Sequence, residues 1–413
     1  MKKILGFALM VVLLLAPVQQ AFAASPDELD KKIAALEAYI ERNYRSHEDT
    51  RLSVEELREI ISEGAQWMNR AQEGNGHFAY EYDVYEGQYL DDDHIVRQGG
   101  ALYQLGEIAR YDTDNALGTH EVIESAIEYF EDLSVADTED GEKILCITED
   151  TDRTPCLLGA TALAVTGMLG YVEAVPEKAD EYDELIDDYM AYIMAMKKEG
   201  EGFRDKYRTG SSLVFLKESS FSNGEALLAL VRYYKHKPSE EVKEMIDETF
   251  AYLAAKAEFE NPLYLWIMAA LKDMQQLWPS EEYVAYAQAF TEYRRAQLSR
   301  IHYTQKNYCA STEGLASAYS VLQGNVTDYE LGRVRDEIDF WNKHNSVLQV
   351  TEVDAYRLID DEQGMRLVQA PDVKNAQGGF LTSATVLTQR IDYTQHCLSA
   401  YLQTLVDVEG EVL

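Results

Sequence analysis

Residues 156–172 read CLLGATALAVTGMLGYV, a stretch that is apolar or small at nearly every position. A helix that is apolar on all its faces is buried, so this stretch predicts a helix in the interior of the protein. Five further stretches share its character: 95–110, 222–235, 261–276, 309–323 and 391–405. Small residues inside these predicted inner helices let neighbouring backbones approach closely; they are Gly99, Gly100, Gly159, Ala160, Gly224, Ala226, Gly314 and Ala316.

Amphipathic, heavily charged stretches alternate with the inner helices, and they predict an outer layer. They are residues 53–70, 119–132, 179–198, 239–256, 280–300 and 327–343. Strict alternation predicts an all-α fold, an (α/α)6 toroid of six helical hairpins. An open solenoid of the same hairpins is the alternative. Repeats of fixed length would favour the solenoid, whereas the uneven spacing here favours a closed ring.

Two segments fall outside the alternation. Residues 29–44 predict an additional N-terminal helix. The stretch 344–389 contains SVLQVTEV and GGFLTSATVL, which are β-branched and alternate in polarity, so we expect a small β insert just before the last inner helix.

The N-terminus has the three parts of a secretory signal peptide. Lys2 and Lys3 precede an apolar run from Ile4 to Pro17, and Ala21-Phe22-Ala23 offers a cleavage site. We therefore expect residues 1–23 to be a signal peptide and residues 24–413 to form a single toroid domain. The run is short for a spanning helix, so no membrane span is expected after cleavage. The predicted location is periplasmic or secreted.

The net charge limits the possible partners, and the cysteine content agrees with export. The chain carries 73 acidic and 37 basic residues, a formal net charge of −36, which disfavours nucleic acid as a partner. Four cysteines in an exported chain predict disulfides. Cys146 and Cys156 lie close enough in sequence to staple a loop, and Cys309 with Cys397 would then join two distant helices. The sequence alone leaves the pairing open.

The alternating hairpins resemble the α/α-toroid proteins, which include six-hairpin glycosidases, polysaccharide lyases and terpenoid-cyclase-like barrels. Gln72-x-x-x-Gly76-x-Phe78 is similar to the Gln-x-x-x-Gly-x-Trp repeat of terpenoid cyclases, with Phe in place of Trp, and Gln377-Gly378-Gly379-Phe380 is a weaker echo. Asp91-Asp92-Asp93 does not match the Asp-rich motif of the cyclases. The resemblance implies a fold and a site at one end of the inner helices, but no catalytic residue.

Polar residues near the N-terminal ends of the inner helices are the candidate site, because burying them without a partner is costly. Paired carboxylates can act as general acid and base, and the predicted catalytic residues are Glu225, Glu313 and Asp392. The predicted substrate-binding residues are Arg97, Gln98, Tyr103, Trp266, Arg390, Tyr393 and His396. A buried ion-pair network that closes the ring is the structural alternative, and Asn223 and Ser311 also lie where helix caps would be.

No cofactor or metal is predicted. Nucleotide-binding motifs are missing from the sequence. Cys309, Cys397 and His396 are the residue types that bind zinc in toroidal lanthionine cyclases, but the order differs here, and a Cys309–Cys397 disulfide is the simpler interpretation.

These features predict an exported carbohydrate-active enzyme, a glycoside hydrolase or a lyase- or epimerase-like protein, acting on a glycan or another extracytoplasmic polymer. The alternative is a non-catalytic toroid that binds a glycan, a peptide or a partner protein.

Overall fold

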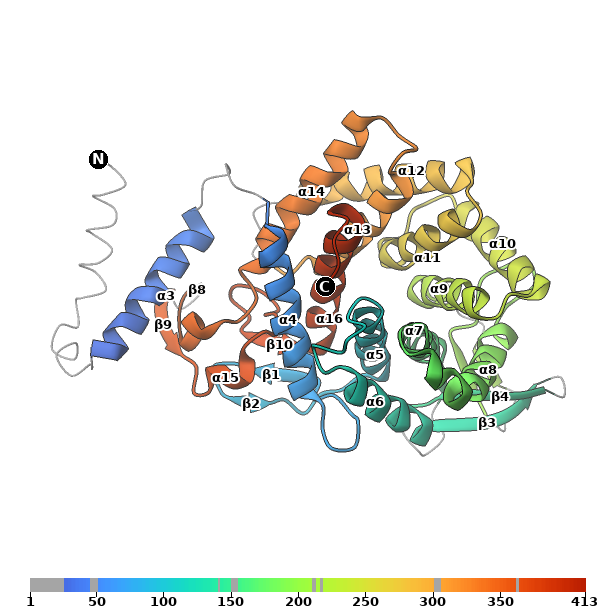
Figure 1. The fold of residues 1–413 in the computed structure, drawn as a ribbon, viewed down its shortest axis with the longest axis horizontal. Helices are drawn as coiled ribbons and strands as arrows, with labels where there is room; N and C mark the ends of the chain where they lie inside the picture. Colours follow the sequence, from blue (N-terminus) through green and yellow to red (C-terminus); the bar gives the residue numbers. More distant parts are fainter. Residues whose placement is uncertain are drawn as a thin grey trace.

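A computed structural model describes residues 26–44, 51–139, 142–149, 155–209, 213–215, 218–300, 306–361 and 364–413. The predicted signal peptide, residues 1–23, lies outside these ranges. Helices dominate the described residues, and the sheets are small (Figure 1), so the predicted all-α class is confirmed. No helix in this part of the chain has the length and apolar character needed to cross a bilayer.

The buried helices form a closed inner ring (Figure 1). They are α5 (Ile95–Ala109), α7 (Leu158–Ala174), α9 (Ser220–His236), α11 (Tyr264–Leu277), α13 (Cys309–Leu322) and α16 (Ile391–Gln403). Each packs against the next, and α16 packs against both α13 and α5. The ring is therefore closed, as the uneven repeat spacing predicted, and it is not an open solenoid.

The amphipathic helices form the outer layer. They are α4 (Val54–Ala71), α6 (His120–Asp132), α8 (Ala179–Ala195), α10 (Glu240–Ala254), α12 (Glu281–Leu298) and α14 (Asp328–Ser346). Ser53 and Thr327 begin α4 and α14 with capping boxes, in which a side-chain oxygen accepts from a free N–H of the first turn. These caps fix where α4 and α14 start.

Glycines allow two inner helices to pack backbone to backbone. A Cβ at Gly106 of α5 would lie 2.2 Å from the carbonyl oxygen of Gly167 on α7, and a Cβ at Gly167 would lie 2.6 Å from the backbone of Leu102. Larger residues would force α5 and α7 apart. The small residues of the inner helices thus set how narrow the ring is.

The β insert is present, but its strands are not where the sequence placed them. The hairpin is β8 (Tyr356–Asp361) with β9 (Gly364–Gln369), followed by the short helix α15 (Val373–Ala376). The two segments predicted as strands instead touch through isolated bridges such as Gln349 with Phe380. Within these segments only residues 348–350 and 378–381 form continuous buried runs, in irregular chain, whereas Val353 and Val386 are exposed. The N-terminal helix α3 (Pro26–Tyr44) packs on β8.

Other small sheets border the ends of the inner helices. β1 (Glu81–Asp83) pairs with β2 (Gln88–Tyr89) and with β10 (Thr388–Arg390), which joins the first and last hairpins. β5 (Cys156–Leu157), β6 (Lys206–Arg208) and β7 (Leu213–Phe215) form a second sheet, and β3 (Ser134–Glu139) pairs with β4 (Glu142–Ile147).

Three links that lead into inner helices share one turn, built around a glycine and a buried phenylalanine. The phenylalanines are Phe78, Phe203 and Phe380. The N–H of each donates to the fourth residue of the inner helix that follows: Gln98 Oε1 at 2.9 Å, Asn223 Oδ1 at 2.7 Å and Thr394 Oγ1 at 3.1 Å. Two of these turns are the Gly-x-Phe segments noticed in the sequence, where Gly76 and Gly378 have φ of 85° and 93°.

The same turn anchors a second residue over the neighbouring inner helix. Two positions after each phenylalanine, a carbonyl oxygen accepts from an N–H at or just before the start of that neighbour. The pairs are Tyr80 O with Ile391 N at 3.0 Å, Asp205 O with Leu158 N at 3.0 Å, and Thr382 O with Asn307 N at 3.2 Å. Residues 80, 205 and 382 therefore lie at one end of the ring.

Candidate functional site

The predicted site residues lie at or near the N-terminal ends of the inner helices, except Tyr103, which lies in the middle of α5. Asp392 is the second residue of α16, Arg97 the third of α5, and Glu313 the fifth of α13. Glu225 and His396 are the sixth residues of α9 and α16. Segments 150–154, 210–212, 216–217 and 301–305, which precede α7, α9 and α13, are not among the described residues.

Two arginines hold the Asp392 carboxylate. Arg390 donates from Nε to Asp392 Oδ1 at 2.9 Å and from Nη2 to Oδ2 at 2.6 Å, and Arg97 Nε lies 3.4 Å from Oδ2. The carboxylate is buried, whereas the arginines reach solvent. Two arginines therefore face one buried carboxylate in a strongly acidic chain.

Two aromatic rings lie next to Arg390. Its guanidinium lies 5.2 Å from the Tyr80 ring centroid and 4.8 Å from that of Tyr393. Burial and the nearby Asp392 charge raise the pKa of Tyr80 to about 12. The flat guanidinium is thus fixed by stacking and by the bidentate pair with Asp392.

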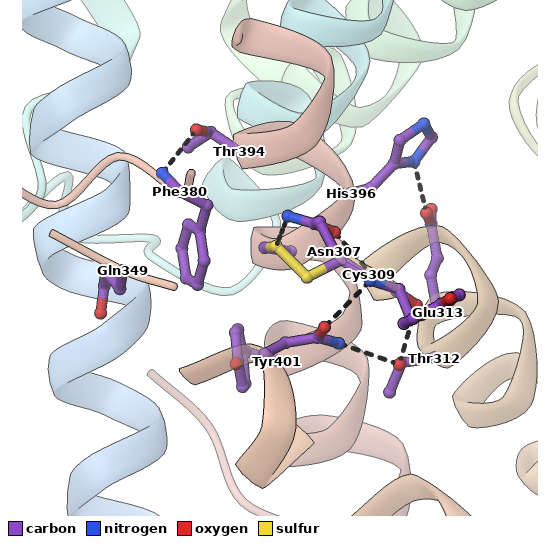
Figure 2. Close-up of a disulfide and its surroundings, with 12 residues drawn as sticks. Asn307, Cys309, Thr312, Glu313, Gln349, Phe380, Thr394, His396 and Tyr401 are labelled. Carbon is purple, nitrogen blue, oxygen red and sulfur yellow. Dashed lines mark hydrogen bonds and ion pairs between the residues drawn. A yellow bond between two sulfur atoms is a disulfide. The ribbon is translucent and has the colours of Figure 1, made fainter. Parts of the chain in front are cut away.

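His396 and Glu313 form a buried pair between α16 and α13. His396 Nδ1 lies 2.8 Å from Glu313 Oε2, and Ser399 Oγ donates to Glu313 Oε1 at 2.7 Å. Figure 2 shows the His396 imidazole pointing to Glu313. The Trp266 ring lies 6.0 Å from His396 and 5.6 Å from Tyr103, so these predicted residues are neighbours.

Glu225 differs from the other two carboxylates. It is 3% exposed, and it has no hydrogen-bond or ion-pair partner among the described residues. Its Oε2 faces α7, because a Cβ at Gly159 would lie 2.3 Å from it. Burial raises the pKa of Glu225 to about 8, with Arg97 lowering it and Asp205 raising it further. Glu225 is therefore a neutral carboxylic acid at pH 7.

Contacts link the predicted carboxylates into one region. Arg97 pairs with Asp392 and acts electrostatically on Glu225. Asp392 lies one helical turn, about 6 Å of rise, before His396, which binds Glu313. Glu313 and Asp392 form hydrogen bonds or ion pairs with neighbouring side chains, whereas Glu225 forms none among the described residues.

Gln98, predicted to bind substrate, binds the backbone of Phe78 in the structure. Its amide accepts from the Phe78 N–H at 2.9 Å and donates to the Phe78 carbonyl at 2.8 Å and to Asp93 Oδ1 at 2.7 Å. These bonds hold the glycine–phenylalanine turn, and contact of Gln98 with a substrate stays a prediction. Asn223 has the same place in the second turn, so it supports the turn and is not an N-cap.

Residues that we did not predict also lie at this end of the ring. Asp205 and Tyr80 have equivalent positions, two residues after a phenylalanine of the repeated turn. Ser222 Oγ donates to Asp205 Oδ1 at 2.6 Å. A sequence signal for Tyr80 and Asp205 does exist. Glycine and phenylalanine recur in Gly76-x-Phe78 before α5 and in Gly202-Phe203 before α9, and each phenylalanine is followed two positions later by Tyr80 or Asp205.

The four cysteines form two disulfides, as predicted, and the structure gives their pairing as Cys146–Cys156 and Cys309–Cys397. Cys309 lies one turn before Glu313 on α13, and Cys397 follows His396 on α16, so the second disulfide crosslinks the two helices beside the His396–Glu313 pair (Figure 2). These cysteines are therefore not thiolate zinc ligands. Within the described ranges, no group of three or more His, Cys, Asp or Glu is placed to hold a metal ion.

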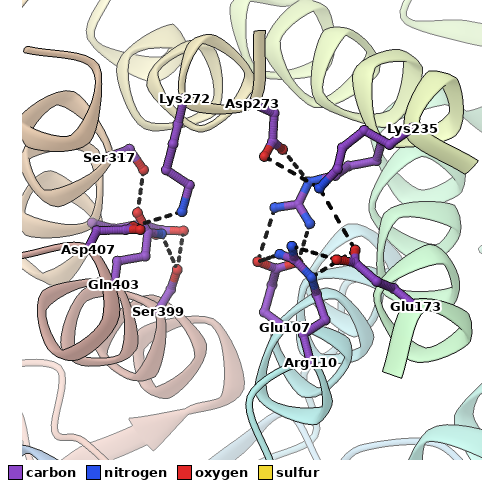
Figure 3. A network of polar contacts seen from close by, with 12 residues as sticks. Glu107, Arg110, Glu173, Lys235, Lys272, Asp273, Ser317, Ser399, Gln403 and Asp407 are labelled. Carbon is purple, nitrogen blue, oxygen red and sulfur yellow. Dashed lines mark hydrogen bonds and ion pairs between the residues drawn. The ribbon is translucent and has the colours of Figure 1, made fainter. Parts of the chain in front are cut away.

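The opposite end of the ring is closed by buried ion pairs. Side chains from all six inner helices meet there (Figure 3). Arg232 pairs with Glu107 at 3.0 Å and with Asp273, and Lys272 Nζ lies 2.8 Å from Asp407. Burial raises the pKa of Glu107, but Arg110 and Arg232 outweigh it and lower the pKa to about 2.

Hydrogen bonds run from this closed end to His396. Ser317 donates to Gln403, Gln403 Nε2 donates to Ser399 Oγ at 2.9 Å, and Ser399 donates to Glu313. A buried ion-pair network, the structural alternative to a functional site, is therefore present, but it is centred at the C-terminal ends of the inner helices.

Two surface hollows lie elsewhere, and none of the predicted site residues lines either of them. One, of about 450 Å³, lies between α3 and the β8–β9 insert and is lined by residues including Lys31, Tyr356, Pro371 and Lys374. The other, of about 210 Å³, lies between α12 and α14.

No protein-family model matches the chain, and no curated protein does. Solved structures match its fold. A GH76 α-mannanase from Bacteroides thetaiotaomicron superposes with a TM-score of 0.60 at 8% identity, over 86% of this chain and 96% of that one. An inactive variant of an α-1,6-mannanase from Salegentibacter, with two aspartates replaced and α-1,6-mannotriose bound, superposes with a TM-score of 0.58 at 10% identity. The match covers 86% of this chain and 99% of that one. A D-mannose isomerase superposes with a TM-score of 0.56 at 12% identity, over 84% of this chain and 96% of that one. The chain therefore has the α/α-toroid fold that its hairpins resembled.

Proposed function

We propose that the chain is an exported carbohydrate-active enzyme that uses acid–base chemistry at the N-terminal ends of its inner helices. The observation that carries this proposal is Glu225, a buried carboxyl group without a partner whose pKa lies at about 8. A general acid must hold its proton at working pH, and burial gives Glu225 that property. Fold alone does not decide function, so the proposal rests on this group and its neighbours.

The reaction that fits best is hydrolysis of a glycosidic bond. Glu225 would donate its proton to the glycosidic oxygen as the bond to the anomeric carbon breaks. Arg97 and Arg390, set by Asp392, would orient the sugar hydroxyls, and Tyr393 and Trp266 offer aromatic faces to sugar rings. The mannanases that share the fold make an α-linked mannoside the first substrate to try.

A second candidate is isomerisation or epimerisation of a free sugar, and the His396–Glu313 pair favours it. Glu313 binds His396 Nδ1, and Nε2 has no partner within the described ranges, so Nε2 would take a proton from a carbon next to a carbonyl group. The shared fold of a D-mannose isomerase agrees with this chemistry.

One experiment separates these candidates. The mature chain is incubated with α-1,6-mannotriose and a panel of aryl glycosides, and separately with mannose, glucose and fructose in D2O. We expect new reducing ends with the wild type and with the exposed-site control Glu244→Gln, but not with Glu225→Gln. Deuterium incorporation at C2 that is lost in His396→Gln would support the second candidate instead. Glycan binding without either reaction would overturn the enzyme proposal and leave the non-catalytic alternative.

Export is part of the proposal. A cleaved signal at residues 1–23 would deliver the chain to an oxidising compartment, and the two disulfides agree with such a location. The high negative charge agrees with a neutral glycan as partner and with no nucleic-acid partner.

A further inference from the structure

Asp205 lies at the same end of the ring as Glu225, and the repeated turn fixes it there. Its carbonyl oxygen accepts from the N–H of Leu158, the first residue of α7, at 3.0 Å. Tyr80 has the equivalent position over α16, where its ring stacks on Arg390. The same hydrogen-bonded turn therefore brings two side chains, those of Tyr80 and Asp205, to the candidate site.

Separate contacts bring Asp205 to the face of α9 that carries Glu225. Ser222 Oγ donates to Asp205 Oδ1 at 2.6 Å. Ser222 precedes Glu225 by three residues, so both lie on one face of the helix with about 4.5 Å of rise between them. Glu225 Oε2 also faces Gly159 of α7, next to the residue whose N–H binds Asp205. Asp205 and Glu225 therefore both lie beside the start of α7, and the Asp205 carboxylate acts electrostatically on Glu225.

The two groups have different surroundings. Glu225 is buried without a partner, whereas Asp205 is half-buried and binds Ser222 through one oxygen, leaving Oδ2 without a partner in the part of the chain that the structure describes. The negative charge of Asp205 also contributes to the raised pKa of Glu225. Two carboxyl groups whose environments differ in this way are the arrangement from which an acid and a base can be assigned.

We propose that Asp205 is the second catalytic carboxylate and works with Glu225 on a glycosidic bond. This inference rests on the proposed hydrolase function. Glu225 donates its proton to the glycosidic oxygen, and the bond from that oxygen to the anomeric carbon breaks. A water molecule attacks the anomeric carbon and gives its proton to Asp205. The products are a sugar hemiacetal and an alcohol, and proton exchange with solvent restores both carboxyl groups.

With this assignment Asp205 takes the place of Glu313 and Asp392 as the partner of Glu225. Asp392 is held by two arginines, and Glu313 by His396 and Ser399. Carboxylates saturated in this way are poor bases, because accepting a proton would break the pairs that hold them. Asp205 has an open oxygen, and partial exposure gives it access to water.

The first test compares leaving groups. Hydrolysis of phenyl and 2,4-dinitrophenyl glycosides of the common hexoses is measured for wild type, Asp205→Asn, Glu225→Gln and the surface control Asp247→Asn. A dinitrophenolate leaves without a proton, so Glu225→Gln should lose about 10²–10⁴-fold on the phenyl glycoside but less than about tenfold on the other. Asp205→Asn should lose about 10²-fold or more on both, because both need the attacking water.

The outcomes separate the two proposals. If Asp205→Asn keeps wild-type rates while Glu225→Gln is inactive on the phenyl glycoside, Asp205 is not the partner and the hydrolase function stands. If wild type cleaves no glycoside of the panel, both proposals fail.

A second test needs no substrate. The protonated-carboxyl infrared band of Glu225, identified by its loss in Glu225→Gln, is titrated in wild type and in Asp205→Asn. Removing the Asp205 charge should lower the midpoint of this titration, whereas Asp247→Asn should leave it unchanged. An unchanged midpoint in Asp205→Asn would show that the two groups do not interact, and it would overturn the assignment.

Discussion

Glu225 makes the stability of the protein depend on pH in a direction opposite to that of most acidic residues. Burial raises its pKa from 4.5 to about 8, so between these values the folded chain binds a proton that the unfolded chain releases. The free energy of unfolding therefore decreases as the pH rises through this window, by about 1.4 kcal/mol per pH unit. Below pH 4.5 the group is neutral in both states and contributes no slope.

Glu225→Gln should remove this pH dependence, because glutamine has a similar shape and no charge. We expect the variant to gain stability relative to wild type as the pH rises from 5 to 8.5. Urea unfolding at both pH values measures the difference, with Glu244→Gln as a control that follows wild type. Parallel stability profiles for wild type and Glu225→Gln would contradict a buried neutral carboxyl group.

Sequence and structure differ most over Asp205. Glu225, Glu313 and His396 could be found in the sequence because each is a polar residue inside an apolar helix. Asp205 lies in RDKYR, a polar stretch that is typical of solvent-exposed chain. Hydrogen bonds from the Leu158 N–H and the Ser222 hydroxyl bring it to the site, and the recurrence of the glycine–phenylalanine turn is the only sequence signal for its position.

The glycine–phenylalanine turns give Gln98 a role that can be separated from substrate binding. Gln98→Met would leave the buried N–H and carbonyl of Phe78 without partners, at about 1–3 kcal/mol each. We expect lower stability and an unchanged KM for the folded fraction, measured by urea unfolding and by kinetics on any accepted substrate. Thr394→Val removes only one such bond, to Phe380, and should cost less. A raised KM at full stability would instead make Gln98 a substrate contact.

The disulfides differ in the loops that they close and in what lies beside them. Cys309–Cys397 spans 88 residues and Cys146–Cys156 spans 10, so the loop-entropy model gives about 4.6 and about 2.7 kcal/mol of stabilisation. Replacing Cys309 and Cys397 by serine should therefore destabilise the protein more than replacing Cys146 and Cys156.

Activity gives a second contrast between the two disulfides. Only the Cys309–Cys397 crosslink adjoins the His396–Glu313 pair, so only its removal should alter the pH profile of any activity that depends on His396. Thermal unfolding and pH–rate profiles of the two double variants test this. Equal effects of both double variants on the pH profile would contradict a positioning role for Cys309–Cys397.

Elements were predictable where burial follows a helical period. All six inner helices were found, because a stretch such as 156–172 is too apolar to lie anywhere but inside. The β insert was found but misplaced. SVLQVTEV and GGFLTSATVL alternate like strands, yet Gln349 and Phe380 touch only at one bridge. In the hairpin at 356–369, residues 356–359 of β8 are buried but include the charged Arg357 and β9 is largely exposed, so the sequence signal is weaker there.

The ring as a whole depends on contacts between the two ends of the chain. β1 pairs with β10, and α4 and α5 pack on α16, across about 300 residues of sequence. Closing so long a loop costs chain entropy that must be offset by contacts formed only when the ring is complete. The 73 acidic residues oppose that closure by mutual repulsion.

Glu409 illustrates how closure is held, because it pairs with two arginines from different parts of the ring. Arg51 lies just before α4 and Arg335 lies on α14. Glu409 is largely buried, at 9% side-chain exposure, whereas the neighbouring pair of Glu411 with Arg58 is exposed, with Glu411 at 49%. Exposed pairs contribute about 0–1 kcal/mol, and hydrogen bonds to charged groups that are less accessible contribute about 1.5–3 kcal/mol.

Glu409→Gln should therefore destabilise the protein by about 1.5–3 kcal/mol, and Glu411→Gln by less than about 1 kcal/mol, although both remove one negative charge from the same segment. If net repulsion dominated instead, the two substitutions would stabilise the protein equally. Urea unfolding of both variants at low and at moderate salt distinguishes these cases, because screening weakens repulsion between distant charges more than a partly buried pair. Equal changes for Glu409→Gln and Glu411→Gln at either salt concentration would contradict a specific role of Glu409 in closing the ring.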